Sequence, residues 1–339
     1  MERPAKLQRL ENLRRGSPFV SQSALESILD NVRKEGVPNQ SSRKLIKKAT
    51  KAALSENTSY GPLLLGQEAI TKEGEKVKFE ITNLATYLHL LYAQMGSFHQ
   101  LLNKTHRDQP SSVDDCWSLM LYGDEIAPGN VLGKAQRKGW SIFCSFLQFP
   151  LQALCNEKSW LTLCHVRSSL VNSLEGGIGQ VMSIILQSIF VQQHFSPGLG
   201  VLLSSEAGNV GLFFKLGVFI QDGSSHKYCF SSKGDSGLKY CLLCNVTASK
   251  VSDEEDPESA ELSHALKYNQ LRVYSDEEIL GTFDRLEQRK AVLSNADFGL
   301  WQKAVGVTYN TQMLLLNAEL RAASVLRPAT QYCHDYMHG

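Results

Sequence analysis

The order of β-type and helical runs over residues 116–222 is the feature that most constrains the fold of this chain. Three β-type runs come first: CWSLMLYGD (116–124), WSIFCSFLQF (140–149) and WLTLCHVRSS (160–169). A glycine-containing turn, EGGIGQ, then leads into an apolar helix over about 178–194, and VGLFFKLGVFIQD (210–222) has the pattern of a buried strand. The sequence therefore predicts strand, strand, strand, helix, strand.

A ribonuclease-H-like fold begins in this order, with three antiparallel strands, a crossover helix and a fourth strand laid beside the first. In that arrangement Asp124, at the end of the first strand, and Asp222, at the end of the fourth, come out side by side. Two such carboxylates can hold Mg²⁺ or Mn²⁺ against a phosphodiester. The alternative is that each aspartate caps a turn. Glu125 is the nearest additional acid, and Asp235 is a second candidate for the later position.

The remainder of the chain is predicted to be mostly helical, which makes the fold class α+β. Residues 1–102 form a helical N-terminal region, because ALESILDNVRK, SRKLIKKATKAAL and ITNLATYLHLLYAQMGSFHQLL repeat apolar residues every three or four positions. The polar stretch NKTHRDQPSSVDD (103–115) is the predicted linker, and 116–244 is a partial ribonuclease-H-like core.

Residues 245–339 are predicted to be a mostly helical insertion. The acidic segment SDEEDPESAE (252–261) is a solvated loop in this interpretation. A capping-box pattern from Ser275 to Glu278 predicts that a helix begins there, and a further helical stretch runs from Leu300 to about Leu326.

A net charge of +1 conceals a basic N-terminal region, in which residues 1–60 hold twelve Lys and Arg against six Asp and Glu. Five of these side chains have helical spacing and could contact the phosphate backbone of DNA: Arg43, Lys44, Lys47, Lys48 and Lys51. The alternative is an ordinary solvated helix face.

The cysteines and apolar runs indicate an intracellular protein. The eight cysteines are spread along the chain, mostly in apolar runs, and form no disulfide framework. The first fifteen residues lack the apolar segment of a signal peptide. The longest apolar stretch, VMSIILQSIFVQQHF, is shorter than the ~20 residues that a membrane span needs. The expected location is intracellular, and nuclear if the protein acts on DNA.

Two short segments carry potential zinc ligands. Cys241 and Cys244 form a C-x-x-C pair, and tetrahedral Zn²⁺ needs two more ligands. Asp335 and His338, in the terminal HDYMHG, form a D-x-x-H pair that could supply them, with Cys333 and His334 as substitutes. The alternative is a core helix that ends in satisfied histidines, with two buried thiols. EGGIGQ lacks the Lys-Ser/Thr of a phosphate-binding loop and is interpreted as a turn.

Three blocks of the sequence resemble CACTA-type DDE transposases. YGDEIAPGN with KGWSIFCSFLQFP is similar to their first catalytic-aspartate block. FIQDGSSHKYCFSSKGDSGLKYCLLC is similar to their second block, and HDYMHG to their D-x-M-H block. The chain also resembles multi-copy, transposon-derived proteins of unicellular algae. The likeness covers residues 116–339 and leaves out the N-terminal third.

The resemblance implies roles for matching positions only. Asp124 and Asp222 take the places of the first two metal-binding acids, and Cys241 and Cys244 those of the C-x-x-C. Asp335 and His338 take those of the D-x-x-H. The third acid of such a triad lies on a helix beyond that block, so we expect the last strand-helix unit and the final acid to lie beyond Gly339. The first block also departs from the plant pattern, with Glu-Ile in place of Gly-Phe.

The leading hypothesis is a transposase-derived protein whose complete relatives cut and join DNA by two-metal phosphoryl transfer, and which is inactive as a truncated chain. A non-catalytic DNA- or protein-binding module is the second hypothesis. The third is an unrelated intracellular α+β protein whose aspartates are all turn caps.

Overall fold

The computed structural model describes residues 22–36, 42–127, 138–191, 200–239, 241–245, 249–250, 262–263 and 272–334. The chain divides after Leu54 into two units. The described part of the first unit contains two helices, α2 (Gln22–Glu35) and α3 (Arg43–Leu54). The second unit contains both helices and strands, so the α+β class is confirmed.

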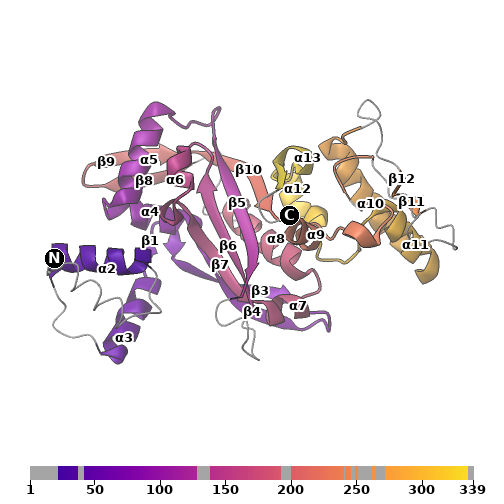
Figure 1. Ribbon diagram of the computed structural model, residues 1–339, viewed down its shortest axis with the longest axis horizontal. Helices are drawn as coiled ribbons and strands as arrows, with labels where there is room; N and C mark the ends of the chain where they lie inside the picture. Colours follow the sequence, from indigo (N-terminus) through magenta and orange to yellow (C-terminus); the bar gives the residue numbers. More distant parts are fainter. Residues whose placement is uncertain are drawn as a thin grey trace, which may run out of the picture. The chain divides into compact units, whose positions relative to one another are not determined.

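A five-stranded sheet forms the centre of the second unit (Figure 1). Its strand order is β13 (Tyr332–His334), β10 (Phe214–Gln221), β5 (Trp117–Ile126), β6 (Gly139–Phe146) and β7 (Leu161–Arg167). The strands β5, β6 and β7 are consecutive and antiparallel, whereas β10 runs parallel to β5 and β13 parallel to β10. The predicted placement of the fourth strand beside the first is therefore confirmed.

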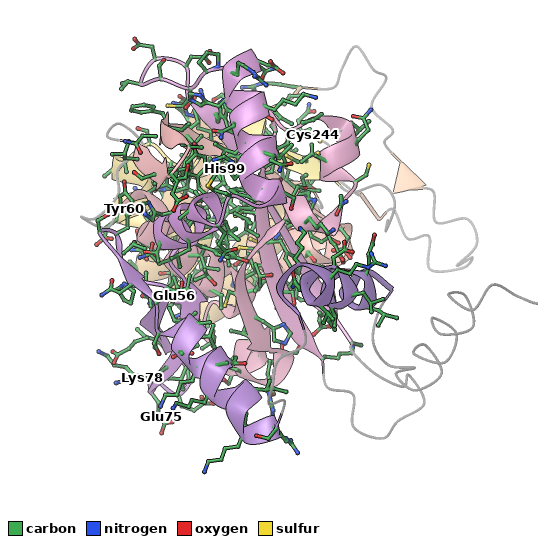
Figure 2. The ribbon with its side chains drawn as sticks, turned by 90° about the vertical axis from the view of Figure 1, so that its left-hand side faces the viewer. Glu56, Tyr60, Glu75, Lys78, His99 and Cys244 are labelled. Atoms are coloured by element: carbon green, nitrogen blue, oxygen red, sulfur yellow. The ribbon has the colours of Figure 1, made fainter. Side chains whose placement is uncertain are left out.

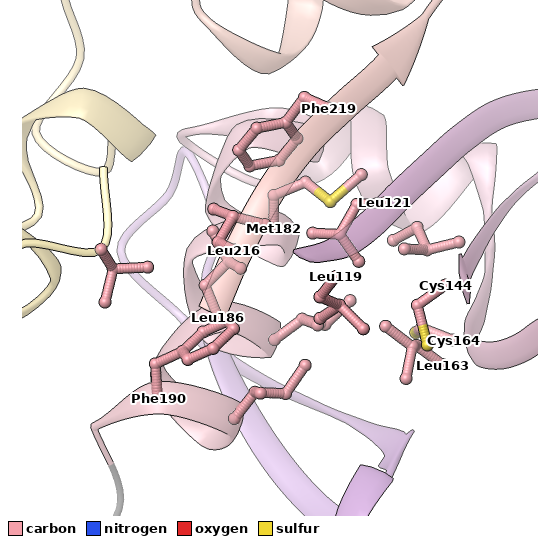
Figure 3. Packing of buried hydrophobic residues seen from close by; sticks show 14 of the residues in the cluster. Leu119, Leu121, Cys144, Leu163, Cys164, Met182, Leu186, Phe190, Leu216 and Phe219 are labelled. Atoms are coloured by element: carbon pink, nitrogen blue, oxygen red, sulfur yellow. The ribbon is translucent and has the colours of Figure 1, made fainter. Parts of the chain in front are cut away.

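One face of the sheet is packed against α8 (Gly177–Phe190), the helix that connects β7 to β10 through a short α7 (Ser168–Ser173) and a hairpin. Leu119 and Leu121 of β5 lie with Met182 and Leu186 of α8 in the buried cluster of Figure 3, and each is fully or almost fully buried. Burying a side chain of this size contributes about 1.5–3 kcal/mol. The apolar run of the sequence thus forms a helix that covers the sheet.

Residues 57–82 do not continue the predicted N-terminal helical region. They form β1 (Asn57–Thr58), β2 (Gly61–Pro62) and a hairpin of β3 (Leu64–Ile70) with β4 (Lys76–Thr82). In KVKFEIT the apolar residues alternate, and Phe79 and Ile81 are buried, which is the period of a strand. Gly74, at φ +81°, makes the turn. Only the segments at α2, α3, α4 (Leu84–Ala93) and α5 (Ser97–Asp108) match the helical prediction.

The predicted linker at 103–115 is also wrong, because residues 103–108 complete α5 and the rest is held against the sheet domain. Ser111 donates its hydroxyl to the Gly211 carbonyl at 3.2 Å, and the Trp117 indole donates to the Gln109 carbonyl at 2.9 Å. Tyr60 and His99, labelled in Figure 2, likewise bond to the hairpin of β8 (Val201–Ser205) and β9 (Gly208–Leu212). The polar residues of this stretch therefore form hydrogen bonds with the rest of the second unit.

The segment after β10 is helical in its described part. It contains α9 (Gly223–Cys229), α10 (Asp276–Val292), α11 (Asn295–Val305), α12 (Ala318–Ala322) and α13 (Pro328–Gln331). The predicted capping box is confirmed, since Ser275 and Glu278 exchange side chain to backbone bonds at the start of α10. The single helix expected over 300–326 is instead broken at Gly306, where φ is +73° and a Cβ would meet the Lys239 carbonyl.

Short elements complete the description: α6 (Leu151–Leu154), β11 (Ser249–Lys250), β12 (Leu262–Ser263) and the 3₁₀ turns Glu157–Ser159, Gly234–Ser236 and Leu314–Leu316. Among the described helices, none combines the length and the apolar character that crossing a membrane requires.

Candidate functional site

Asp124 lies in β5, and Asp222 directly follows β10, the adjacent parallel strand. Ile220 of β10 pairs with Tyr122 of β5, so two further residues along each strand bring Asp222 level with Asp124. Gly123 faces α8, since a Cβ there would lie 2.7 Å from the Met182 methyl carbon and 3.2 Å from the Gln221 amide nitrogen. Because neighbouring residues of a strand point to opposite faces, Asp124 belongs to the face away from α8.

The two carboxylates have different local roles. Asp222 directly follows β10 and is the N-cap of α9, where its Oδ1 accepts the Ser225 N–H at 2.6 Å. Asp222 is therefore a turn cap, as the alternative interpretation holds. Asp124 lies inside β5, and its Oδ2 accepts a 3.4 Å bond from the Tyr122 hydroxyl. Aspartate is depleted in strands, so β-propensity does not explain its presence at this position.

Ser141 and His165 extend this polar row across the sheet, and the sequence analysis missed both. Ser141 of β6 pairs with Asp124 on one side and with His165 of β7 on the other. The Ser141 Oγ and His165 Nδ1 lie 2.8 Å apart, and the serine is buried whereas the histidine is exposed. The serine lies between acid and imidazole, so this is no Ser-His-Asp triad, in which histidine is central. Only the strand register could have revealed the row.

The two additional acids named from the sequence do not join this row. Glu125 points to the opposite face from Asp124 and forms an ion pair with Lys138 at 3.4 Å. Asp235 lies in the 3₁₀ turn Gly234–Ser236, thirteen positions after Asp222. The described residues contain no group of three or more His, Cys, Asp or Glu side chains placed to hold a metal ion.

Cys241 and Cys244 form a compact turn beside the start of α10. Both thiols are half-buried, and the Leu243 N–H donates to the Cys241 Sγ at 3.4 Å. Burial is the main cause that raises the pKa of Cys241 above its ordinary value. Cys244 pairs with Val273 in an antiparallel bridge, and the Tyr274 N–H donates to the Leu243 carbonyl at 2.8 Å. The C-x-x-C is thereby attached to the residues that precede α10.

Asp335 and His338 lie outside the described residues, so the zinc site stays a prediction. The chain just before them is described. The Ala329 N–H of α13 donates to the Asp276 Oδ1 of α10 at 2.7 Å. The C-x-x-C turn therefore contacts Val273 and Tyr274 just before α10, and α13 contacts Asp276 at the first position of α10.

The sheet has a fifth strand that the sequence pattern did not predict. The strand β13 is formed by Tyr332–His334 and pairs in parallel with β10. The His226 Nε2 lies 3.0 Å from the Cys333 carbonyl, and its ring stacks on Tyr332 at 3.7 Å. Three residues without an apolar alternation give no strand signal in the sequence. The position of this strand is set by the contacts of Tyr332 and Cys333 with His226 of α9.

The basic cluster forms a single exposed helix. Arg43, Lys44, Lys47, Lys48 and Lys51 all belong to α3, and all are exposed. Positions 44, 47, 48 and 51 have the i, i+3, i+4, i+7 spacing that places them on one side of the helix.

Comparison with known protein families gives no match to this sequence, and characterised proteins show no significant similarity to it. The candidate site is therefore supported by the geometry of the chain itself.

Proposed function

We propose that this chain is a transposon-derived protein with a ribonuclease-H-like domain of the DDE transposase class. The observation that carries the proposal is the strand order of the sheet together with its two aspartates. Three antiparallel strands are followed by a crossover helix, a fourth strand parallel to the first and a fifth parallel to the fourth. Asp124 lies in the first of these strands and Asp222 directly follows the fourth, and the first two sequence blocks of the resemblance each contain one of these aspartates.

The residues present fit a divalent cation in part. Mg²⁺ commonly binds one or two carboxylates and completes its octahedron with water and substrate phosphate oxygens. Asp124 supplies a carboxylate from β5, and Asp222 supplies one from the residue that directly follows the neighbouring strand β10. The Tyr122 hydroxyl and the Ser225 N–H each bond to one carboxylate oxygen and so restrict its orientation.

The chemistry proposed for complete relatives is phosphoryl transfer. A bound Mg²⁺ or Mn²⁺ would stabilise charge on the phosphate and lower the pKa of an attacking water or 3′-hydroxyl. The part of this chain is to hold that ion with Asp124 and Asp222. Such a protein would work where DNA is found, in the nucleus of a eukaryotic cell.

Metal binding tests this proposal directly. Mn²⁺ titration followed by electron paramagnetic resonance should show a bound ion in the unaltered chain, and Asp124→Asn and Asp222→Asn should each weaken its binding at least tenfold. Asp115→Asn is the control, because Asp115 is an exposed loop carboxylate outside the row. Mn²⁺ binding that is equal in all four proteins would refute the site.

A second candidate, a non-catalytic DNA-binding protein, is favoured by the exposed basic side of α3. If α3 contacts phosphates, nonspecific duplex binding should weaken steeply with salt. Neutralising Lys44, Lys47 and Lys48 together should lower the slope by about three, or about one per lost contact. DNA binding without Mn²⁺ binding would select this candidate over the first, and an unchanged slope would leave α3 a solvated helix.

A further inference from the structure

A cavity of about 630 Å³ opens on the opposite side of the sheet from Asp124. Its walls are the end of β5 and the start of β6, the α7–α8 connection, and the segment from α9 to the turn at 234–236. Glu125 and Trp140 line it, and they alternate along their strands with Asp124 and Ser141, which belong to the other face. The cavity is therefore distinct from the polar row.

The cavity has a positive lining. Its ionisable side chains are four lysines and two glutamates, an excess of two positive charges: Lys72, Lys138, Lys227, Lys233, Glu125 and Glu175. Both glutamates already have partners. Glu125 is paired with Lys138, and the Glu175 Oε1 accepts from the Thr311 hydroxyl at 2.7 Å. The Glu125–Lys138 pair cancels one charge of each sign, and the Lys72 Nζ also donates to the Asn172 carbonyl at 2.8 Å. The excess of two positive charges therefore comes from Lys72, Lys227 and Lys233 against Glu175.

The turn EGGIGQ, expected to be only a turn, forms the end of this cavity and the start of α8. Gly176 is the N-cap of α8 and supplies no side-chain cap to the helix. A Cβ at Gly176 would lie 2.5 Å from the Gln312 carbonyl oxygen, and Gly177 has φ +54°. The space beside Gly176 is thus filled by Gln312, whereas no described atom lies within 4 Å of a Cβ built at Gly177. Gly176, Gly177 and Ile178 line the cavity, so the positive end of the α8 dipole lies at its wall.

A buried hydroxyl gives independent support for a ligand. Ser168 lines the cavity at only 6% exposure, and its Oγ has no hydrogen-bond partner within the described part of the chain. Burying a hydroxyl without a partner is unfavourable. An oxygen-rich ligand would supply the missing bond.

We propose that this cavity binds the phosphate group of a nucleotide, with Lys227, Lys233 and the start of α8 as its main contacts. The volume lies within the roughly 300–1,000 Å³ of small-molecule sites. The phosphomonoester could belong to a mononucleotide or to the 5′ end of a DNA strand. The inference goes beyond the proposed function, because it requires neither Asp124 nor Asp222.

Isothermal titration calorimetry in EDTA tests the proposal with four ligands: dAMP, deoxyadenosine, and one oligonucleotide with a 5′-phosphate or a 5′-hydroxyl. We expect dAMP to bind and deoxyadenosine not to bind. Tighter binding of the 5′-phosphorylated strand than of dAMP identifies the strand end as the ligand, and the reverse identifies a mononucleotide. Equal binding of dAMP and deoxyadenosine overturns phosphate recognition.

Variants locate the site. Lys227→Gln and Lys233→Gln should each weaken dAMP binding about tenfold, the effect of one lost charge-assisted hydrogen bond. Lys215→Gln is the matched control, because Lys215 is exposed on β10 and does not line the cavity. Ser168→Ala should also weaken dAMP binding. This variant leaves every charged side chain of the cavity in place. The assignment is refuted if the Lys215 control loses as much dAMP affinity as the cavity variants, or if none of the three cavity variants loses any.

A final comparison separates this site from the proposed metal site. The double variant Asp124→Asn, Asp222→Asn should keep dAMP binding in EDTA while it loses Mn²⁺. Loss of dAMP binding in that variant would contradict the placement of the phosphate site on the other face. Failure of Mn²⁺ binding alone would leave the cavity proposal unaffected.

Discussion

The sheet and the helical segment that follows it hold their candidate residues in different ways. In the sheet, strand register places Ser141 between Asp124 and His165, and the core is packed on the opposite face. In the segment from 223 to 334, single hydrogen bonds at turns and helix ends do this work, such as the Ala329 to Asp276 bond. The pairing of strands is made by many hydrogen bonds, so the loss of one side chain should not move the row. A site held by single caps should be disturbed when any one cap is lost.

The largest expected effect breaks the sheet core. Leu121→Ala removes a fully buried side chain from β5 and should lower the free energy of unfolding by about 2–5 kcal/mol, because it leaves a cavity against α8. Leu300→Ala, at a side chain 65% exposed on α11, should change it by less than about 0.5 kcal/mol. Urea denaturation measures both. Equal losses of unfolding free energy would mean that the two side chains contribute equally to stability.

Zinc removal should act on the helical segment alone. If Cys241 and Cys244 share Zn²⁺ with the terminal D-x-x-H, the metal stabilises the closed segment by about 2.7 kcal/mol at a free concentration one hundred times its dissociation constant. Chelation, or Cys241→Ser, should then increase hydrogen exchange in 272–334 and leave β5 and β6 protected. Metal analysis of the purified protein provides the direct check. A preparation without zinc and without this exchange difference would reduce both motifs to structural residues.

Alkaline pH should destabilise both regions to a similar degree. Burial raises the pKa of Cys164 in β7 and of Cys229 in α9 to about 12 each, from 9.0. Each folded thiol keeps its proton where the unfolded one loses it, so this stability is present below pH 9 and falls between pH 9 and about 12. At pH 10 each thiol should account for a loss of about 1.4 kcal/mol.

Cysteine variants separate the two contributions. Cys164→Ala and Cys229→Ala should each flatten the decrease in stability between pH 8 and 10. Cys155→Ala should leave it unchanged, because that thiol is exposed. Urea denaturation at both pH values supplies the numbers, and a pH dependence that persists in the double buried variant would assign it to other groups.

The smallest effect concerns the cap that begins α10. Ser275→Ala removes the hydroxyl that accepts the Glu278 N–H, which is the serine's half of the capping box, and should cost about 1 kcal/mol. Because Tyr274 just before Ser275 bonds to the C-x-x-C turn and Asp276 just after it bonds to α13, exchange protection should fall at both places together. Thr282→Ala, within the same helix, is the control and should leave the α13 contact protected. If hydrogen-exchange protection were lost only within α10, the contacts of the C-x-x-C turn and of α13 would not depend on the cap at Ser275.

Local pattern determined most of what the sequence predicted correctly. The alternation and length of three β-type runs, the apolar helix after them and the buried strand ending at Asp222 were sufficient for the first four strands of the sheet. Capping chemistry was sufficient for the start of α10 at Ser275, because a cap is made by residues three positions apart. The helices at α3, α4 and α5 followed from apolar spacing in the same way.

Tertiary contacts decided the rest. The hairpin at 64–82 lies between helical segments and was not predicted. The polar stretch 103–115 was mistaken for a linker, because the bonds of Ser111 to Gly211 and Phe213 join residues about a hundred positions apart. The strand β13 has only three residues and is held by His226 and β10. The row from Asp222 to His165 and the lysine-lined cavity exist only once the strands are paired. Periodicity reports which face a residue takes, whereas its neighbours on that face depend on register and packing across the whole sheet.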